Sequence, residues 1–185
     1  MNIKRELLLI FSALATLLSA QPAQALLTMQ LNLKQLTVLA ERVFVGTCVE
    51  VKETRDEQRR EVQYVTFQVE EVLKGEPATE IRFKQMANKG LGADLPQYSV
   101  GEEAVVFLAA AHPETGLSAP IGLIQGKFVI QSSGERGRQV VNGVGNRGLL
   151  VGLQKGSKVK RLSTGEGHGP LPFEGFVSLV KDLAK

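Results

Sequence analysis

The strongest constraint on the fold is a two-residue alternation of side-chain character that begins at residue 43. One face of this segment is apolar or β-branched: Val43, Val45, Thr47, Val49 and Val51. A period of two is typical of a strand, because successive side chains of a strand point to opposite faces. Gly46 lies on the other face, and a glycine inside a strand indicates a bend or a close backbone approach. The segment therefore predicts a β-strand at the start of a mostly β fold.

The second predicted strand, at residues 61–75, changes phase part-way along. Its apolar set runs through the odd-numbered Val65, Phe67 and Val69 and then jumps to the even-numbered Val72. One extra residue in one strand of a pair produces such a change, because every later side chain then moves to the other face. We therefore predict a β-bulge at Glu70 and Glu71.

Further strands are predicted at residues 79–86, 104–111, 126–131 and 138–142. The first of these alternates, with Ile81 and Phe83 expected inward and Arg82 and Lys84 outward. Residues 104–111 are apolar on both faces, which is typical of a fully buried strand. The last two stretches predict a hairpin.

Two short helices flank the strands. Asn32 is placed to cap a helix over residues 32–41, with Gln35 in capping-box position. Residues 173–184 carry apolar side chains at the i, i+3, i+4, i+7 spacing of an amphipathic helix. We expect this second helix to pack on the domain rather than to reach a membrane.

Three connecting segments have distinct compositions. Residues 53–61 are charged with both signs, which favours an exposed hairpin connection. Residues 87–102 form a long loop, and loops of that length are often functional. Residues 143–169 are rich in Gly, Lys and Ser, so we expect weak structure there.

The first 25 residues have the layout of a cleavable secretory signal. Lys4 and Arg5 precede an apolar run at residues 7–18, and Ala23 and Ala25 place small residues at the cleavage site. About a dozen apolar residues are too few to cross ~30 Å of hydrocarbon. We expect cleavage after Ala25, a periplasmic or extracellular protein, and no membrane span.

The charge balance gives no sign of an anionic partner. The chain has 22 Lys and Arg and 19 Asp and Glu, and without Lys4, Arg5 and Glu6 these become 20 and 18, a net charge of +2. A nearly balanced surface argues against nucleic acid or anionic lipid. Aromatic residues are also scarce on the predicted strands, with Tyr64 and Phe67 the main candidates for base stacking.

Few side chains are candidates for chemistry. Cys48 is the single cysteine, so no internal disulfide forms, and its mid-strand position predicts a buried structural thiol rather than a nucleophile. His112 and His168 lie far apart in turn-like contexts, without a second histidine at ligand spacing. We therefore expect no zinc site.

Gly143, Gly145 and Gly148 spell GxGxxG. That motif binds pyrophosphate only where it joins a strand to a helix in a βαβ unit, and the following residues do not predict a helix. We interpret it as a flexible Gly-rich loop.

Two segments, AERVFVGTCVEV and YVTFQVEEVLKG, are followed after a long loop by a GEEAVVFL strand. This pattern resembles the netrin-like domains, the group that includes tissue inhibitors of metalloproteinases. It is also similar to exported bacterial proteins with a VGTVxEV strand and a QGKF turn, here residues 125–128. The resemblance covers roughly residues 33–131. It implies an OB-like five-stranded barrel with helices packed against it.

The inhibitors of that family act through an amino-terminal cysteine that chelates zinc. A mature chain that starts at Leu26 has no such cysteine. No inhibitory residue is carried over to this chain.

Together these features predict a mainly β fold, a five-stranded OB-like (netrin-like) barrel with a short N-terminal helix and a C-terminal amphipathic helix. The expected parts are a signal peptide at 1–25, the barrel domain at 26–153, a flexible linker at 154–170 and the C-terminal helix at 171–185.

We expect an exported, non-enzymatic module that binds a protein partner through the loop at 87–102 and the strand ends beside it. The resemblance points to a secreted protease, in particular a metalloprotease. No catalytic, cofactor-binding or metal-binding residue is expected, and no cofactor. The alternatives are an enzyme of unknown reaction and an OB-type nucleic-acid binder.

Overall fold

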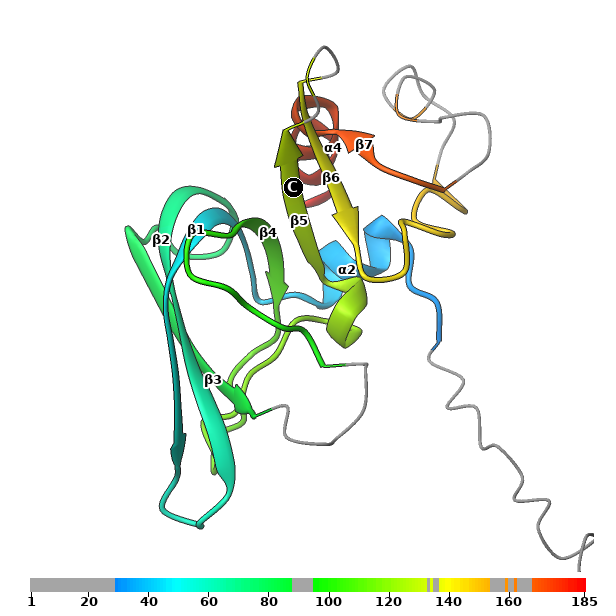
Figure 1. Ribbon diagram of the computed structural model, residues 1–185. Helices are drawn as coiled ribbons and strands as arrows, with labels where there is room; N and C mark the ends of the chain where they lie inside the picture. The colour runs from blue at the N-terminus through cyan, green and yellow to red at the C-terminus, as the bar shows by residue number, and fades with distance from the viewer. Residues whose placement is uncertain are drawn as a thin grey trace, which may run out of the picture.

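The computed structural model describes residues 29–87, 95–132, 137–153 and 168–185, together with Gly134, Val159 and Leu162. The expected signal peptide lies outside the described residues, as does most of the expected linker. Within the described part, seven strands form one antiparallel sheet in the order β3-β2-β1-β4-β5-β6-β7 (Figure 1). The strands are β1 (Arg42–Arg55), β2 (Glu61–Lys74), β3 (Glu80–Met86), β4 (Glu103–Leu108), β5 (Lys127–Ser132), β6 (Arg138–Asn142) and β7 (Leu171–Pro172).

The fold is mainly β, as predicted, but the expected strand number of five is wrong. The sheet continues past β5 because β6 returns along it as a hairpin, and Leu171 and Pro172 then pair with β6 as β7. The strand pairings of the described residues begin at β3 and end at β7, so the sheet is open. Beyond β2, strand β3 makes one isolated bridge, between Lys84 and Leu117.

The predicted bulge in β2 is confirmed. Val45 pairs with Glu71 and Gly46 pairs with Val69, so Glu70 is the extra residue. The register shifts at two more places along this pair, which leave Leu73 and Val49 without a partner across the ladder. Bulges increase the local twist and bend of a strand pair. They account for the strong curl of the long β1–β2 hairpin in Figure 1.

Gly46 lies where the two strands approach closely. A Cβ atom at this position would lie 2.5 Å from the backbone oxygen of Gln68. The sequence therefore predicted the reason for this glycine correctly, and any side chain here would push β1 and β2 apart.

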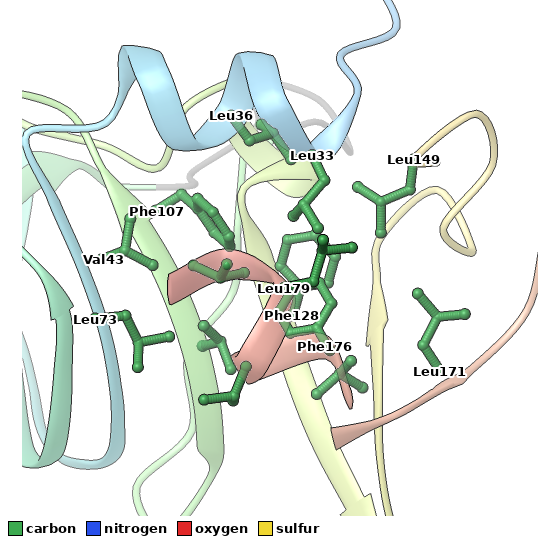
Figure 2. Packing of buried hydrophobic residues seen from close by; sticks show 14 of the residues in the cluster. Leu33, Leu36, Val43, Leu73, Phe107, Phe128, Leu149, Leu171, Phe176 and Leu179 are labelled. Carbon is green, nitrogen blue, oxygen red and sulfur yellow. The ribbon is translucent and has the colours of Figure 1, made fainter. Parts of the chain in front are cut away.

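The two faces of the sheet carry two separate hydrophobic clusters. The larger cluster, which we call the helix-covered cluster, lies between the sheet and the two helices α2 (Leu33–Leu39) and α4 (Phe173–Leu183) (Figure 2). Its centre is Phe176, whose ring lies 4.8 Å from that of Phe128 and 6.3 Å from that of Phe107, between ring centroids. The expected packing of the C-terminal helix against the domain is therefore what the structure has.

The smaller cluster, which we call the aromatic cluster, fills the concave side of strands β1 to β4. Phe67 is at its centre, in ring contact with Phe44, Phe83 and Tyr98. Strands β1 and β4 contribute alternate side chains to both clusters, since Val43 and Phe107 face the helices while Phe44 and Val106 face the aromatic side. The predicted burial of residues 104–111 on both faces holds as far as Leu108.

Helix α2 has the predicted capping box. Asn32 accepts a hydrogen bond from the Gln35 backbone N–H, and the Gln35 side chain accepts one from the Asn32 N–H. At the other end, the Lys74 ammonium donates to the carbonyl oxygens of Thr37 and Ala40 at 2.7 and 2.6 Å. A cation at a helix C-terminus satisfies carbonyls that have no intrahelical partner.

Among the described helices, none is long and apolar enough to cross a bilayer.

Candidate functional site

A cleft of about 820 Å³ opens beside the first half of β3. One wall is formed by β3 from Glu80 to Lys84 and by Tyr64 of the neighbouring strand. The opposite wall comes from the start of β1 and from the segment that follows β4. Its residues are Glu41, Arg42, Leu108, Ala109, Ala111, Gly116 and Ser118. A cleft of this volume lies in the range of sites that bind a ligand or a short chain segment.

The cleft lies where the curled sheet does not close. Residues 109–119 double back on themselves, with the Ala109 N–H bonded to the Ala119 oxygen and the His112 N–H bonded to the Leu117 oxygen. This excursion meets β3 at one point, where the Ser118 N–H donates to the Lys84 oxygen at 2.7 Å. From Glu80 to Phe83, on the N-terminal side of Lys84, no such bridge joins the two walls among the described residues.

Charged side chains line the cleft on both walls. The Arg82 guanidinium lies over the Tyr64 ring, 4.6 Å from its centroid. Such a cation–π contact fixes the direction of an arginine while leaving its N–H groups free to bind an anion.

Lys84 is held near the tip of the β1–β2 hairpin. Its ammonium lies 3.9 Å from the Asp56 carboxylate, which Arg60 also contacts at 2.5 Å. The hydrogen bond from the Arg60 side chain, with the charges of Arg60 and Lys84, lowers the pKa of Asp56. The charged run at 53–61 is thus a hairpin connection, as predicted, with Asp56 organising its turn.

Ser118 contributes an aliphatic hydroxyl to the lining of the cleft. Its Oγ donates to the Ala109 carbonyl oxygen at 2.7 Å, so it ties together the two arms of the excursion. That bond gives Ser118 a structural role.

The loop expected to carry recognition is described from residue 95 onward, where Pro96 and Tyr98 are buried while Gln97, Ser99 and Val100 are exposed. Tyr98 is 9% exposed and packs edge-on against Phe67 and Phe83. Residues 88–94 lie outside the described residues. Tyr98 thus completes the aromatic cluster, and recognition by this loop stays a prediction.

Lys127 holds this loop in place. Its ammonium forms an ion pair with Glu102 at 2.5 Å, donates to the Gln97 carbonyl oxygen and lies 4.6 Å from the centroid of the Tyr98 ring. The charged group is almost fully buried but has a carboxylate, a carbonyl and an aromatic face around it. Such a paired charge fixes the geometry of a loop more than it adds stability.

Gln125, two residues before Lys127, anchors the start of the described chain by hydrogen bonds. Its side chain accepts a hydrogen bond from the Leu31 N–H at 2.9 Å and donates to the Met29 oxygen at 3.1 Å. A Cβ at Gly126 would lie 2.3 Å from the Ile121 oxygen. The QGKF turn therefore has a structural explanation at each of its four positions, with Phe128 in the helix-covered cluster.

Cys48 is buried, as predicted. Burial and the Glu102 carboxylate raise the pKa of its thiol. Burial also raises the pKa of Tyr98 well above its ordinary value. A buried thiol with a raised pKa is a poor nucleophile near neutral pH, because the thiolate is the reactive form.

The two histidines lie apart from each other and from Cys48 in the sequence. The His112 Nδ1 accepts a hydrogen bond from the Glu114 N–H at 3.3 Å, within the turn that closes the excursion. Over the residues that the structure describes, no three His, Cys, Asp or Glu side chains come together as metal ligands would. That the protein binds no zinc stays a prediction.

The GxGxxG segment is a series of tight turns, and the expectation of a flexible loop is wrong there. Asn142 and Asn146 bond reciprocally, since each side-chain oxygen accepts from the other residue's backbone N–H at 2.8 and 3.0 Å. Asn146 is 2% exposed and also donates to the carbonyl oxygens of Val140 and Gly169. The glycines provide positive-φ backbone at Gly145 and Gly148, and no helix follows them.

The sequence predicted that Arg82 and Lys84 point outward, but it did not indicate the cleft. One of its two walls includes Glu41 before β1 and Gly116 and Ser118 after the predicted strand at 104–111, which the strand pattern leaves out. The position of Arg82 over Tyr64 depends on the β2–β3 register, in which Tyr64 pairs with Lys84. A register of this kind is set by tertiary packing and is not visible in one strand alone.

No protein-family model matches the chain, and no curated protein matches it either.

Proposed function

We propose that this protein is an exported, non-enzymatic module that binds a protein partner in the cleft beside β3. The single observation that carries the proposal is the open cleft of about 820 Å³, lined by backbone and charged side chains at an unclosed edge of the sheet. Loops and edges on a rigid scaffold commonly carry recognition. The export step rests on the signal layout of residues 1–25.

The finer fold assignment is part of the same proposal. Strands β1 to β5 would correspond to the five-stranded, partly open barrel of an OB-like, netrin-like domain, with β6, β7 and the helices added at the β5 edge. The adjacency of β3, β2, β1, β4 and β5 in the sheet supports it. A secreted protease, in particular a metalloprotease, is the partner that the resemblance suggests.

The chemistry of the cleft favours binding over catalysis. The Ser118 hydroxyl donates a hydrogen bond to a backbone oxygen, and the Cys48 thiol is packed in the aromatic cluster. Both candidate nucleophiles therefore have structural roles. Arg82 is held by an aromatic ring and is placed to receive an anion.

A site-specific crosslinking experiment tests the proposal. A photoreactive amino acid replaces Glu80, an exposed residue of the cleft wall, and in a matched variant replaces Lys52, an exposed residue of β1 outside the cleft. Both variants are expressed in the native cells and the exported fraction is irradiated. We expect a protein crosslinked from position 80 and not from position 52. The same products from both positions, or none from position 80, would contradict the proposed site.

A further inference from the structure

One edge of β3 faces the cleft. Backbone N–H and C=O groups of a strand point alternately to its two sides. The Lys84 oxygen is bonded to the excursion through Ser118, whereas the Ala87 N–H and the Thr79 oxygen are bonded to β2. Even-numbered residues of β3 therefore direct their backbone groups into the cleft. Within the described part of the chain, Glu80 and Arg82 have no strand partner on that side.

An unpaired row of backbone groups is a template for a further strand. The stretch from Glu80 to Phe83, ahead of the bridged Lys84, offers about 10 Å of edge, at about 3.3 Å per residue. The excursion of residues 109–119 already makes one parallel bridge to this edge, between Leu117 and Lys84. The free stretch of β3 lies next to that bridge, on the same edge of the strand.

The two faces of this edge differ in chemistry. On the inner face Ile81 and Phe83 are each 5% exposed, and Leu108 and Ala109 line the cleft across from β3. On the outer face the side chains of Glu80 and Arg82 are exposed. A strand lying against β3 would therefore place alternate side chains against an apolar wall and beside charged groups.

The charges on the outer face favour an acidic neighbour toward the second half of the edge. Arg82 has the Tyr64 ring as its partner and, among the described residues, no carboxylate within ion-pair distance. Lys84 lies 3.9 Å from Asp56, whose carboxylate is already bonded to Arg60. Opposite charges side by side on neighbouring strands stabilise the pairing, and like charges oppose it.

We propose, resting on the binding function above, that the cleft takes an extended segment of a partner protein that adds to β3 as a further strand. The segment alternates apolar residues, which face Ile81 and Phe83, with acidic residues, which face Arg82 and Lys84. Backbone hydrogen bonds to Glu80 and Arg82 give affinity, and the alternation gives specificity.

Binding of labelled synthetic peptides to the purified protein tests this mode. The probe is a short capped peptide in which valine and glutamate alternate, and its affinity is followed by fluorescence anisotropy. A matched peptide with lysine in place of glutamate should bind at least about tenfold more weakly. Equal affinity for both peptides would overturn the assigned charge preference.

Backbone pairing is tested by N-methylation of the same acidic peptide. Methyl groups on one set of alternate amides should abolish binding, and methyl groups on the other set should leave most of it, because only one set faces β3. Equal losses from both sets would overturn strand addition. This readout does not depend on any change to the protein, so a folding defect cannot imitate it.

Two protein variants complete the design. Arg82→Pro removes the edge N–H without removing a β2–β3 hydrogen bond, since that N–H points into the cleft, and proline is tolerated on such an edge. Arg82→Ala keeps the N–H and removes the charge. We expect Arg82→Pro to abolish binding and Arg82→Ala to weaken it while the preference between the two methylated peptides persists. Unchanged binding to Arg82→Pro would overturn the proposal.

The outcomes separate the two proposals. In one outcome a partner crosslinks from position 80, but peptide binding does not depend on which set of amides is methylated. The cleft would then remain the binding site, and strand addition would be excluded. A dimer of the protein that Arg82→Pro dissociates would replace the partner segment by the β3 edge of a second copy, and so overturn the proposed occupant.

Discussion

The two hydrophobic clusters lie on opposite sides of β1 and β4 and are closed in different ways. Two helices cover one cluster, where Phe176 of α4 meets Phe107 and Phe128 of the sheet (Figure 2). The other cluster is closed by a loop that inserts Tyr98, and Ile81 and Phe83 at its margin line the open cleft. Helices therefore close one side of the sheet, while a loop held by Lys127 and an unpaired strand edge border the side on which we propose that a partner binds.

The largest effect that this comparison predicts comes from Phe176→Ala. Truncation of a fully buried phenylalanine at the centre of the helix-covered cluster should lower the free energy of unfolding by about 3–5 kcal/mol. Denaturant unfolding measures this. The matched variant Phe83→Ala should also destabilise the protein, but it alone should change peptide affinity, because Phe83 lines the cleft. A larger change in affinity for Phe176→Ala than for Phe83→Ala would break the comparison.

A smaller effect is expected from Lys127→Met. Removing the ammonium leaves the Glu102 carboxylate without its ion-pair partner and releases the Gln97 carbonyl, at a cost of about 2 kcal/mol. Hydrogen exchange over residues 95–102 should accelerate as well.

The control for this prediction is Lys181→Met. Lys181 forms an ion pair with Glu71 at 2.5 Å, but both side chains are more than two-fifths exposed. Its loss should cost less than about 1 kcal/mol. Equal destabilisation by the two lysine variants would show that burial of the Lys127 pair has no special consequence.

The variant Cys48→Ser tests the packing of the aromatic cluster. A hydroxyl in place of the thiol in this apolar site should cost about 1 kcal/mol. The thiol also predicts a pH dependence. Because folding raises its pKa above the ordinary 9.0, the folded state binds the proton more tightly, and this contribution to stability is present below pH 9 and is lost as the pH rises.

Stability measured between pH 8 and 10 should therefore fall more steeply for the wild-type protein than for Cys48→Ala. Rapid labelling of Cys48 by a thiol reagent in the folded protein would contradict its burial.

The smallest effect is expected at the hairpin tip, from Asp56→Asn. The contacts with Arg60 lower the pKa of Asp56, so its contribution to stability is present above its ordinary pKa of 3.8 and is lost as the pH falls through the lower folded value. Asp56→Asn should therefore lower stability slightly at neutral pH and flatten the acid limb of the stability curve, because the contribution that acid removes is already absent from the variant. An NMR titration of the Asp56 carboxyl checks the direction of the shift, and a pKa at or above 3.8 would refute it.

The parts of the fold that the sequence predicted are those set by local spacing. The phase change between Val69 and Val72 located the bulge at Glu70, and Asn32 with Gln35 located the start of α2. Both features depend on residues within a few positions of each other, where periodicity and capping chemistry act directly.

The parts that it missed depend on contacts between distant segments. Nothing local distinguishes Tyr98 in a loop from an exposed aromatic, and its burial follows from Lys127, 29 positions later, which holds the loop against β5. The rigid turns at residues 142–148 similarly depend on Asn146 reaching Gly169. Neither the strand periodicity nor the capping pattern indicated the cleft, because its two walls come together only when the sheet curls.

The placement of α4 also bears on the order in which the chain acquires its structure. The helix-covered cluster joins α2 to α4, two helices far apart in the sequence, so Leu33 and Phe128 are fully shielded only after α4 is available. Ribosomes deliver a chain from its N-terminus, and contacts between distant segments slow the search for the native state. This side of the sheet would therefore stay uncovered in an emerging chain until α4 has followed it.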